Sequence, residues 1–240
     1  MRFRPLLLLL FGLVSCSVNP PKPPSPAEIA GASAKTIAVA PFNMALPLPA
    51  KLRSSPPIVS DALIEHLIEQ GKEPKLIEVD LGKALWLESV KEVRRSGGPK
   101  NFKAAVHLFA RKVHQRIDFD ALIIPALYIQ DAKTDLETAR WDGANQWVEY
   151  NGRSRQLIEM PPSMTIPAAS LLIYVFDPEG DTIHSKRTGL ELIQHMVLHI
   201  EKQQGYDKRT WVLKDDDPAI EDDIRVRAAV AHSLYPYLPK

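Results

Sequence analysis

The stretch Thr36 to Phe42, which reads TIAVAPF, decides the first half of the fold. A short run of apolar and β-branched residues that ends at a proline predicts a buried strand. The predicted elements continue with a helix at 58–70, a strand at 75–79, helices at 81–95 and 102–117, and a strand at 121–130. Pro125 lies inside the last of these strands and indicates an edge or a bulge. Helices that alternate with strands predict parallel βαβ units.

The second half of the chain predicts antiparallel strands. Residues 169–176 form an apolar strand, and the turn DPEG leads to a returning strand at 182–187. Residues 190–200 fit a strand by their alternation and a helix by their 3.6-residue spacing, so the pattern leaves both open. A last helix begins at 217–218 and is expected to bury Ile220, Ile224 and Ala228. The predicted class is α/β, a mixed sheet with the order β-α-β-α-α-β followed by a β-meander and a C-terminal helix.

The composition excludes several classes of protein. The chain has 240 residues, 30 Lys and Arg against 29 Asp and Glu, 45% hydrophobic residues and 25% charged residues. A net charge of +1 argues against a basic nucleic-acid binder, and the hydrophobic share is that of a globular domain. Because Cys16 is the single cysteine, neither a disulfide framework nor a cysteine zinc cluster can form within the chain.

The first sixteen residues predict export and lipidation. Two arginines precede an apolar run, residues 6–14, that is about half of the ~20 residues needed to span a bilayer. Residues 1–15 are therefore predicted to be a signal peptide. The string LVSC that ends at Cys16 resembles the bacterial lipobox, in which the cysteine is lipid-modified, with palmitate among the acyl chains, and becomes the first residue. Ser17, where inner-membrane lipoproteins tend to have Asp, favours the outer membrane, with the protein facing the periplasm.

Residues 16–35 are predicted to form a proline-rich tether. Five prolines between Pro20 and Pro26 fix the backbone and remove hydrogen-bond donors, so this segment is expected to be extended and unpacked. It would hold a single periplasmic α/β domain, residues 36–240, away from the membrane surface.

The polar segment at 131–167 is the main insert in the predicted domain. A projecting hairpin is expected here, with arms at 146–150 and 155–160 around the turn dipeptide Asn151-Gly152. Aromatic residues and arginines are enriched at binding hot spots. The candidate partner-binding residues are Trp141, Trp147, Tyr150, Arg153 and Arg155. The alternative is that both tryptophans fold back over the sheet as a small satellite core.

The sequence carries weaker signals for metal binding and catalysis. Glu191, His195 and His199 are spaced by four residues and would share one face of a helix, as metal ligands do. A solvated polar face explains the same spacing, so neither a metal nor another cofactor is predicted. The nucleophile-elbow pattern G-x-S-x-G and the glycine-rich phosphate loops do not occur in the sequence. No catalytic residue is assigned, and the prediction is that the protein is not an enzyme.

Four segments resemble a known group of envelope proteins. These segments are IAVAPF (37–42), DALIEHL (61–67), DALIIPA (120–126) and LLIYVFDPEGD (171–181). The pattern is similar to bacterial envelope lipoproteins with a TolB amino-terminal-like domain, a group that includes the curli secretion lipoprotein and the penicillin-binding-protein activator lipoprotein. The resemblance implies a non-catalytic, lipid-anchored protein that docks on or scaffolds another envelope protein. The alternative it implies is a homo-oligomer, a ring subunit of an outer-membrane secretion or envelope-spanning apparatus.

Overall fold

A mixed β-sheet forms the centre of the computed structural model, which describes residues 24–96, 101–135, 138–148, 150–151, 165–203, 206–216 and 219–238. Five strands follow one another across it: β2 (Glu73–Leu76), β1 (Thr36–Val39), β3 (Ala121–Asp135), β7 (Thr165–Phe176) and β8 (Thr182–Leu192). β1 pairs in parallel with β2 and β3, whereas β3, β7 and β8 form an antiparallel meander. The predicted mixed α/β class is confirmed.

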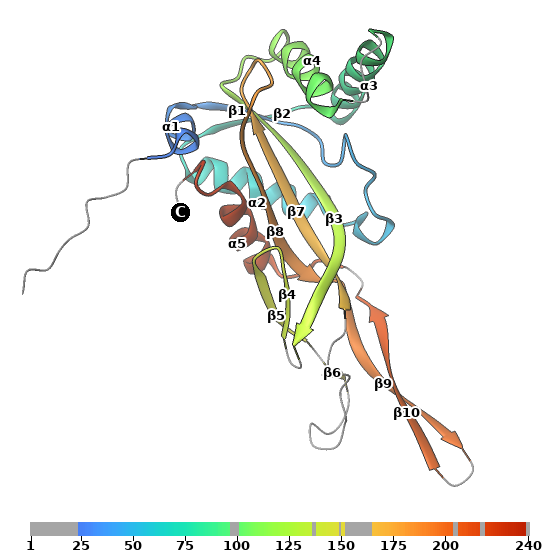
Figure 1. Cartoon of the computed structure of the whole chain (residues 1–240). Helices are drawn as coiled ribbons and strands as arrows, with labels where there is room; N and C mark the ends of the chain where they lie inside the picture. The colour runs from blue at the N-terminus through green and yellow to red at the C-terminus, as the bar shows by residue number, and fades with distance from the viewer. Residues whose placement is uncertain are drawn as a thin grey trace, which may run out of the picture.

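Helices cover both faces of this sheet, and the alternation of side chains along the strands assigns each face. Ile37, Val39 and Ile123 pack in one core cluster together with residues of α2 (Pro56–Glu69) and α5 (Asp223–Leu234). The intervening residues, such as Ala38 and Leu122, pack in a second cluster with α3 (Val79–Arg95) and α4 (Phe102–His114). Figure 1 shows the α3–α4 pair at one end of the long strands. A short 3-10 helix, η1 (Ala50–Leu52), lies in the loop before α2.

Pro125 lies in a central strand and not at an edge or a bulge. It is paired with Ile173 of β7 without a register shift at this point, so that prediction was wrong. The missing N–H is tolerated because β1 has already ended at Val39 on the other side of β3. Asn43 occupies that side: its backbone N–H donates to the Pro125 carbonyl (3.1 Å), and its side-chain amide both donates to and accepts from the backbone of Leu127.

The hairpin in the insert differs from the predicted one. It consists of β4 (Thr138–Trp141) and β5 (Ala144–Trp147), joined by Asp142 and Gly143, whose φ values are 38° and 76°. Two central residues with positive φ are the geometry of a tight hairpin turn, for which Asp-Gly is favoured. Gln146 therefore pairs with Ala139, and the predicted second arm at 155–160 lies outside the described residues.

Residues 190–200 are extended, which settles the open choice between strand and helix. β8 continues to Leu192, the chain bends at the buried Ile193, and β9 (Gln194–Gln203) pairs with β10 (Tyr206–Asp215). A short strand, β6 (Tyr150–Asn151), joins β9 in a three-stranded sheet. We call β9 and β10 the ribbon, and Figure 1 shows that it projects away from the rest of the molecule. Within the described residues, no helix is long and apolar enough to cross a lipid bilayer.

The end of the predicted tether is a helix packed on the domain. α1 (Pro26–Ser33) has a capping box, in which the Ser25 hydroxyl accepts from the Glu28 N–H and the Glu28 carboxylate accepts from the Ser25 N–H. At its other end, the Lys72 ammonium donates to the carbonyls of Gly31 and Ala34, each at 2.7 Å. The expectation of an extended, unpacked segment is thus wrong for residues 24–33, because proline at the first helical positions favours a helix start.

The last helix begins later and buries another face than predicted. α5 begins at Asp223, where the Asp222 side chain caps it, and Ile224 is 79% exposed. Its buried residues are Val226, Ala229, Val230, Ser233 and Leu234. The predicted face assumed a helix that starts at 217–218, and a start five residues later leaves Ile220 in the buried loop before the helix.

Candidate partner-binding site at the root of the ribbon

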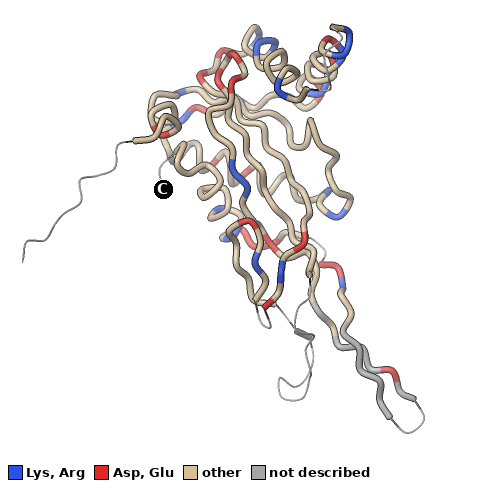
Figure 2. Tube along the Cα trace, in the orientation of Figure 1, with Lys and Arg blue, Asp and Glu red and all other residues tan. Residues whose placement is uncertain are grey.

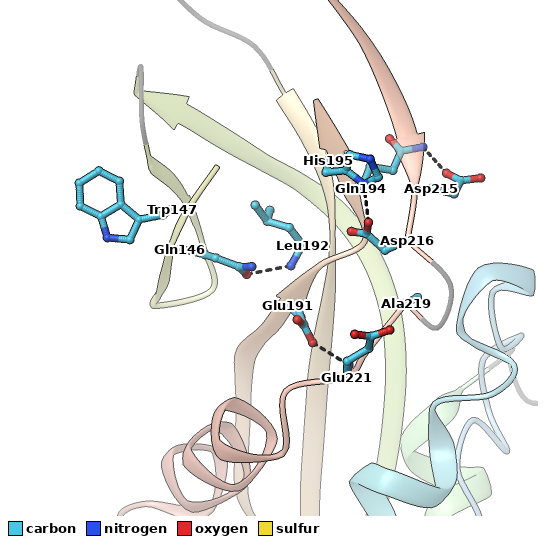
Figure 3. A pocket seen from close by; sticks show the side chains of 10 residues that line it. All are labelled: Gln146, Trp147, Glu191, Leu192, Gln194, His195, Asp215, Asp216, Ala219 and Glu221. Atoms are coloured by element: carbon cyan, nitrogen blue, oxygen red, sulfur yellow. Dashed lines mark hydrogen bonds and ion pairs between the residues drawn. The ribbon is translucent and has the colours of Figure 1, made fainter. Parts of the chain in front are cut away.

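A polar pocket of about 350 Å³ lies where the ribbon joins the domain, and we call it the root pocket. It is formed by β5, the β8–β9 bend, the end of β10 and the segment before α5 (Figure 3). Its lining residues are Gln146, Trp147, Glu191, Leu192, Gln194, His195, Asp215, Asp216, Ala219 and Glu221. Four of these residues are acidic, and Figure 2 shows both acidic and basic positions where the ribbon leaves the domain.

Hydrogen bonds at the root pocket fix the base of the ribbon. The Nδ1 atom of His195 lies 2.5 Å from an oxygen of Asp216, which comes directly after β10. One oxygen of Asp215 accepts from the Lys51 ammonium and from the Gln194 amide, each at 2.5 Å. The two carboxylates at the end of β10 are thus engaged by groups on β9 and on η1. These contacts orient the ribbon relative to the sheet.

Glu191 is engaged by the backbone at the other wall of the pocket. Its Oε2 atom accepts hydrogen bonds from the backbone N–H groups of Glu221 (3.0 Å) and Asp222 (3.3 Å), just before α5. Burial raises the pKa of the Glu191 carboxyl, and these two hydrogen bonds oppose that shift. The carboxylates of Glu191, Asp215 and Asp216 thus lie on two walls of the root pocket, and each of the three is bound by a protein group.

The two tryptophans of the insert have different environments. Trp141 is 5% exposed, and its indole N–H donates to the Ala169 carbonyl at 3.0 Å, so it belongs to a satellite core with Ala139, Ile166 and other residues. The prediction that Trp141 contacts a partner at the surface is wrong. The alternative, that its ring folds back over the sheet, is correct for Trp141. Trp147 is 62% exposed at the rim of the root pocket, on the far side from Asp215 and Asp216 (Figure 3).

The remaining predicted contact residues are only partly described. The backbone of Tyr150 forms β6 and pairs with Met196 of β9, which brings the insert against the ribbon. The side chain of Tyr150 and the whole of Arg153 and Arg155 lie outside the described residues, as does Cys16. That these residues bind the same partner as Trp147 stays a prediction.

The structure separates the three weak metal candidates. Glu191 and His195 both line the root pocket, on the two sides of the bend at Ile193. His199 lies on β9 four positions after His195. Four residues along a strand span ~13 Å, so the backbone geometry places His199 too far from His195 to share one metal ion with it. Among the residues that the structure describes, no group of three or more potential ligands is placed to hold a metal.

Several residues of the pocket were missed by the sequence analysis. Gln146 accepts a hydrogen bond from the Leu192 N–H at 3.0 Å and connects β5 to β8, but nothing in the local sequence indicates that contact. The sequence analysis assigns no role to Asp216, which binds His195 in the folded chain. The dipeptide Asp142-Gly143 favours a tight hairpin turn, so the sequence could have predicted the β4–β5 turn that positions Trp147.

Comparisons with known proteins add little to this geometry. No protein-family model matches the chain, and no curated protein matches it. The crystal structure of lipoprotein GNA1162 from Neisseria meningitidis is similar to this chain with a TM-score of 0.29 and 15% identity, over 65% of this chain and 81% of that one. A similarity at this level carries no argument about a shared fold, activity or partner.

Proposed function

We propose that the chain is a non-catalytic, lipid-anchored envelope protein that docks on another envelope protein through the rim of the root pocket. The observation that carries the docking role is Trp147, a tryptophan 62% exposed beside a polar pocket and held on a tight hairpin. Tryptophan buries a large area on binding with little loss of conformational freedom, which is why it is frequent at binding hot spots.

The arrangement of the pocket supports binding in preference to catalysis. His195 and Asp216 resemble two members of a hydrolytic triad, but the residues that line the described pocket include no serine, cysteine, threonine or lysine that could act as a nucleophile. Three of its four carboxylates, those of Asp215, Asp216 and Glu191, are engaged by Lys51, His195 and the backbone before α5. The proposal therefore assigns them the task of holding the docking surface.

The lipid anchor is tested through Cys16. We expect Cys16→Ser to move the full chain from the membrane fraction to the soluble periplasmic fraction, because one thioether-linked lipid provides the attachment. Ser17→Asp is the matched variant: it should keep the lipid but shift the protein to the inner membrane in an enteric host. Mass spectrometry of the amino terminus would reject the anchor if it showed an unmodified chain that begins elsewhere.

The docking role is tested with the full chain in its native membrane. A photo-cross-linking residue at position 147 should give an adduct with one envelope protein, whereas the same residue at Leu87, 56% exposed on α3, should not. Once that protein is identified by mass spectrometry, Trp147→Ala should weaken its affinity by ~10-fold or more, and Leu87→Ala should not. Equal behaviour of the two positions would exclude this surface.

A further inference from the structure

The outer strands β2 and β8 of the main sheet are each protected along part of their outer edge. In β2 the backbone N–H groups of Glu73 and Ile77 donate to carbonyls on the β1 side, so the alternation places Pro74 with its missing donor at the outer edge. At the other edge, the N–H groups of Gly189 and Leu192 in β8 donate to the Asp142 carbonyl and the Gln146 side chain. Proline and covering hairpins are common ways to prevent pairing between edges.

β10 is a terminal strand of the three-stranded sheet, ten residues long and without a proline. Its pairing with β9 proceeds through all ten positions without a register shift. The Asp216 N–H donates to the Ile193 carbonyl, so that pair is hydrogen-bonded, and the alternation makes Val212 and Val197 a hydrogen-bonded pair as well. The backbone groups of Arg209, Trp211 and Leu213 therefore face the edge of β10 at which no strand of the described residues pairs.

This alternation restricts how two copies of β10 could pair with each other. In an antiparallel pair, outward-facing residues must lie opposite outward-facing residues. A two-fold axis must then pass through a residue position and not between two positions. An axis at Trp211 would place Lys208 opposite Lys214 and Asp207 opposite Asp215, which are like charges and therefore unfavourable.

An axis at Val212 gives the favourable arrangement. Arg209 then lies opposite Asp215 of the second copy, and this pair occurs twice because of the symmetry. Lys51 and Gln194 both bind the Oδ1 atom of Asp215, so the pair with Arg209 would use the other carboxylate oxygen. Trp211 lies opposite Leu213, Thr210 opposite Lys214, and Val212 opposite itself. An axis at Thr210 would instead place Lys208 opposite Val212 and Asp207 opposite Leu213, so charged residues would face apolar ones. Opposite-charge and aromatic–aliphatic cross-strand pairs each stabilise a sheet.

We propose that β10 is a self-association edge, at which two copies of this chain pair their β10 strands antiparallel about a two-fold axis at Val212. The result is a four-stranded sheet in the order β9-β10-β10-β9. The pairing uses the ribbon edge and does not depend on the docking role of Trp147. Two copies anchored in one membrane have a high local concentration, so a short paired segment suffices.

The test is a disulfide at the axis, formed in the purified full chain in detergent. Val212 would lie in a non-hydrogen-bonded pair, with Cα atoms about 4.5 Å apart, within the range that a disulfide bridges. Val212→Cys should therefore give a disulfide-linked dimer on mild oxidation. Val197→Cys is the matched control: the two Val197 positions would be three strand spacings, ~14 Å, apart. The chain without a substitution is a further control, because it shows how much disulfide-linked dimer Cys16 forms by itself.

A second pair of variants tests the register. In the Val212→Cys background, Arg209→Gln should lower the dimer yield by about threefold or more, because two opposite-charge pairs are lost. Lys202→Gln removes a positive charge of β9, a strand that takes no part in the β10–β10 pairing, and should change little. Absence of the disulfide dimer, equal yields from positions 212 and 197, or a ring of higher order by light scattering would overturn the proposal.

Discussion

Gly31 of α1 packs directly against the backbone carbonyl of Tyr237, so closely that a Cβ atom at position 31 would lie 1.6 Å from that oxygen. This contact joins the first described helix to the last described segment of the chain. Tyr237 and Leu238 are fully buried in the core cluster that also contains Ile37 and Leu63. The start of the domain therefore includes α1, which lies within the predicted tether at 16–35.

The first prediction concerns this contact. Gly31→Ala should lower the free energy of unfolding by about 1–3 kcal/mol, because the added methyl group must displace α1 from Tyr237. Helix propensity alone predicts the opposite sign, a gain of ~1 kcal/mol. Urea denaturation followed by tryptophan fluorescence gives the answer. Ala32→Leu, at an exposed position of the same helix, should be nearly neutral.

The second prediction is a loss of stability at acidic pH caused by His184. Its ring is buried, its Nε2 atom lies 2.8 Å from the Ser233 carbonyl, and burial lowers its pKa below the ordinary value of a histidine. The unfolded chain then binds this proton more readily than the folded chain, so stability is full above about pH 6.5 and falls as the pH drops. His184→Gln should reduce the slope of stability against pH between 7 and 5. An unchanged slope would assign the effect to another group, such as His66, whose pKa burial also lowers.

The third prediction compares two glycines with positive φ. Gly180, at φ 91°, closes the β7–β8 turn against α4, where a Cβ would lie 2.5 Å from the Cα of His107. Gly71, at φ 69°, has open space around it. Gly71→Ala should cost only the conformational penalty of about 1 kcal/mol, whereas Gly180→Ala adds a backbone clash and should cost clearly more. Similar thermal midpoints for the two variants would contradict the close approach of His107.

The fourth prediction concerns the side chain that completes the hydrogen bonds of β3. Asn43→Asp keeps an acceptor for the Leu127 N–H but removes the donor to the Leu127 carbonyl. Because Leu127 is fully buried, we expect the unfolding free energy to fall by about 1–3 kcal/mol. Asn145→Asp on the exposed face of β5 is the matched control and should have little effect. If both variants unfold at the same denaturant concentration, Asn43 does not hold this part of the sheet.

Much of the fold could be predicted because it depends on local patterns. The apolar run of β1, the helical spacing in α2 and α4, and the DPEG turn between β7 and β8 each lie where their own residues indicate. Errors arose where a residue acts through a distant neighbour. Pro125 is acceptable in a central strand because Asn43 replaces β1 there, and the two residues are far apart in the sequence.

The candidate site was harder to predict for the same reason. The root pocket combines Gln146, Glu191, His195 and Asp216 from three segments, and only their spatial meeting shows that each polar group already has a partner. The four-residue spacing would place Glu191, His195 and His199 on one face of a helix. The strand geometry separates the two histidines, because a residue advances more than twice as far along a strand as along a helix.

From its sequence, the chain could be assigned to the α/β class, and its amino terminus indicated export and lipidation, because periodicity, turn residues and a short terminal motif are local properties. The packing of α1 on Tyr237, the burial of Trp141 against the exposure of Trp147, and the terminal place of β10 in its sheet all emerged from the folded molecule. Each of these features depends on which segments contact one another in the folded chain. Burial of apolar side chains and backbone hydrogen bonding decide those contacts, and both act between residues that are distant in the sequence.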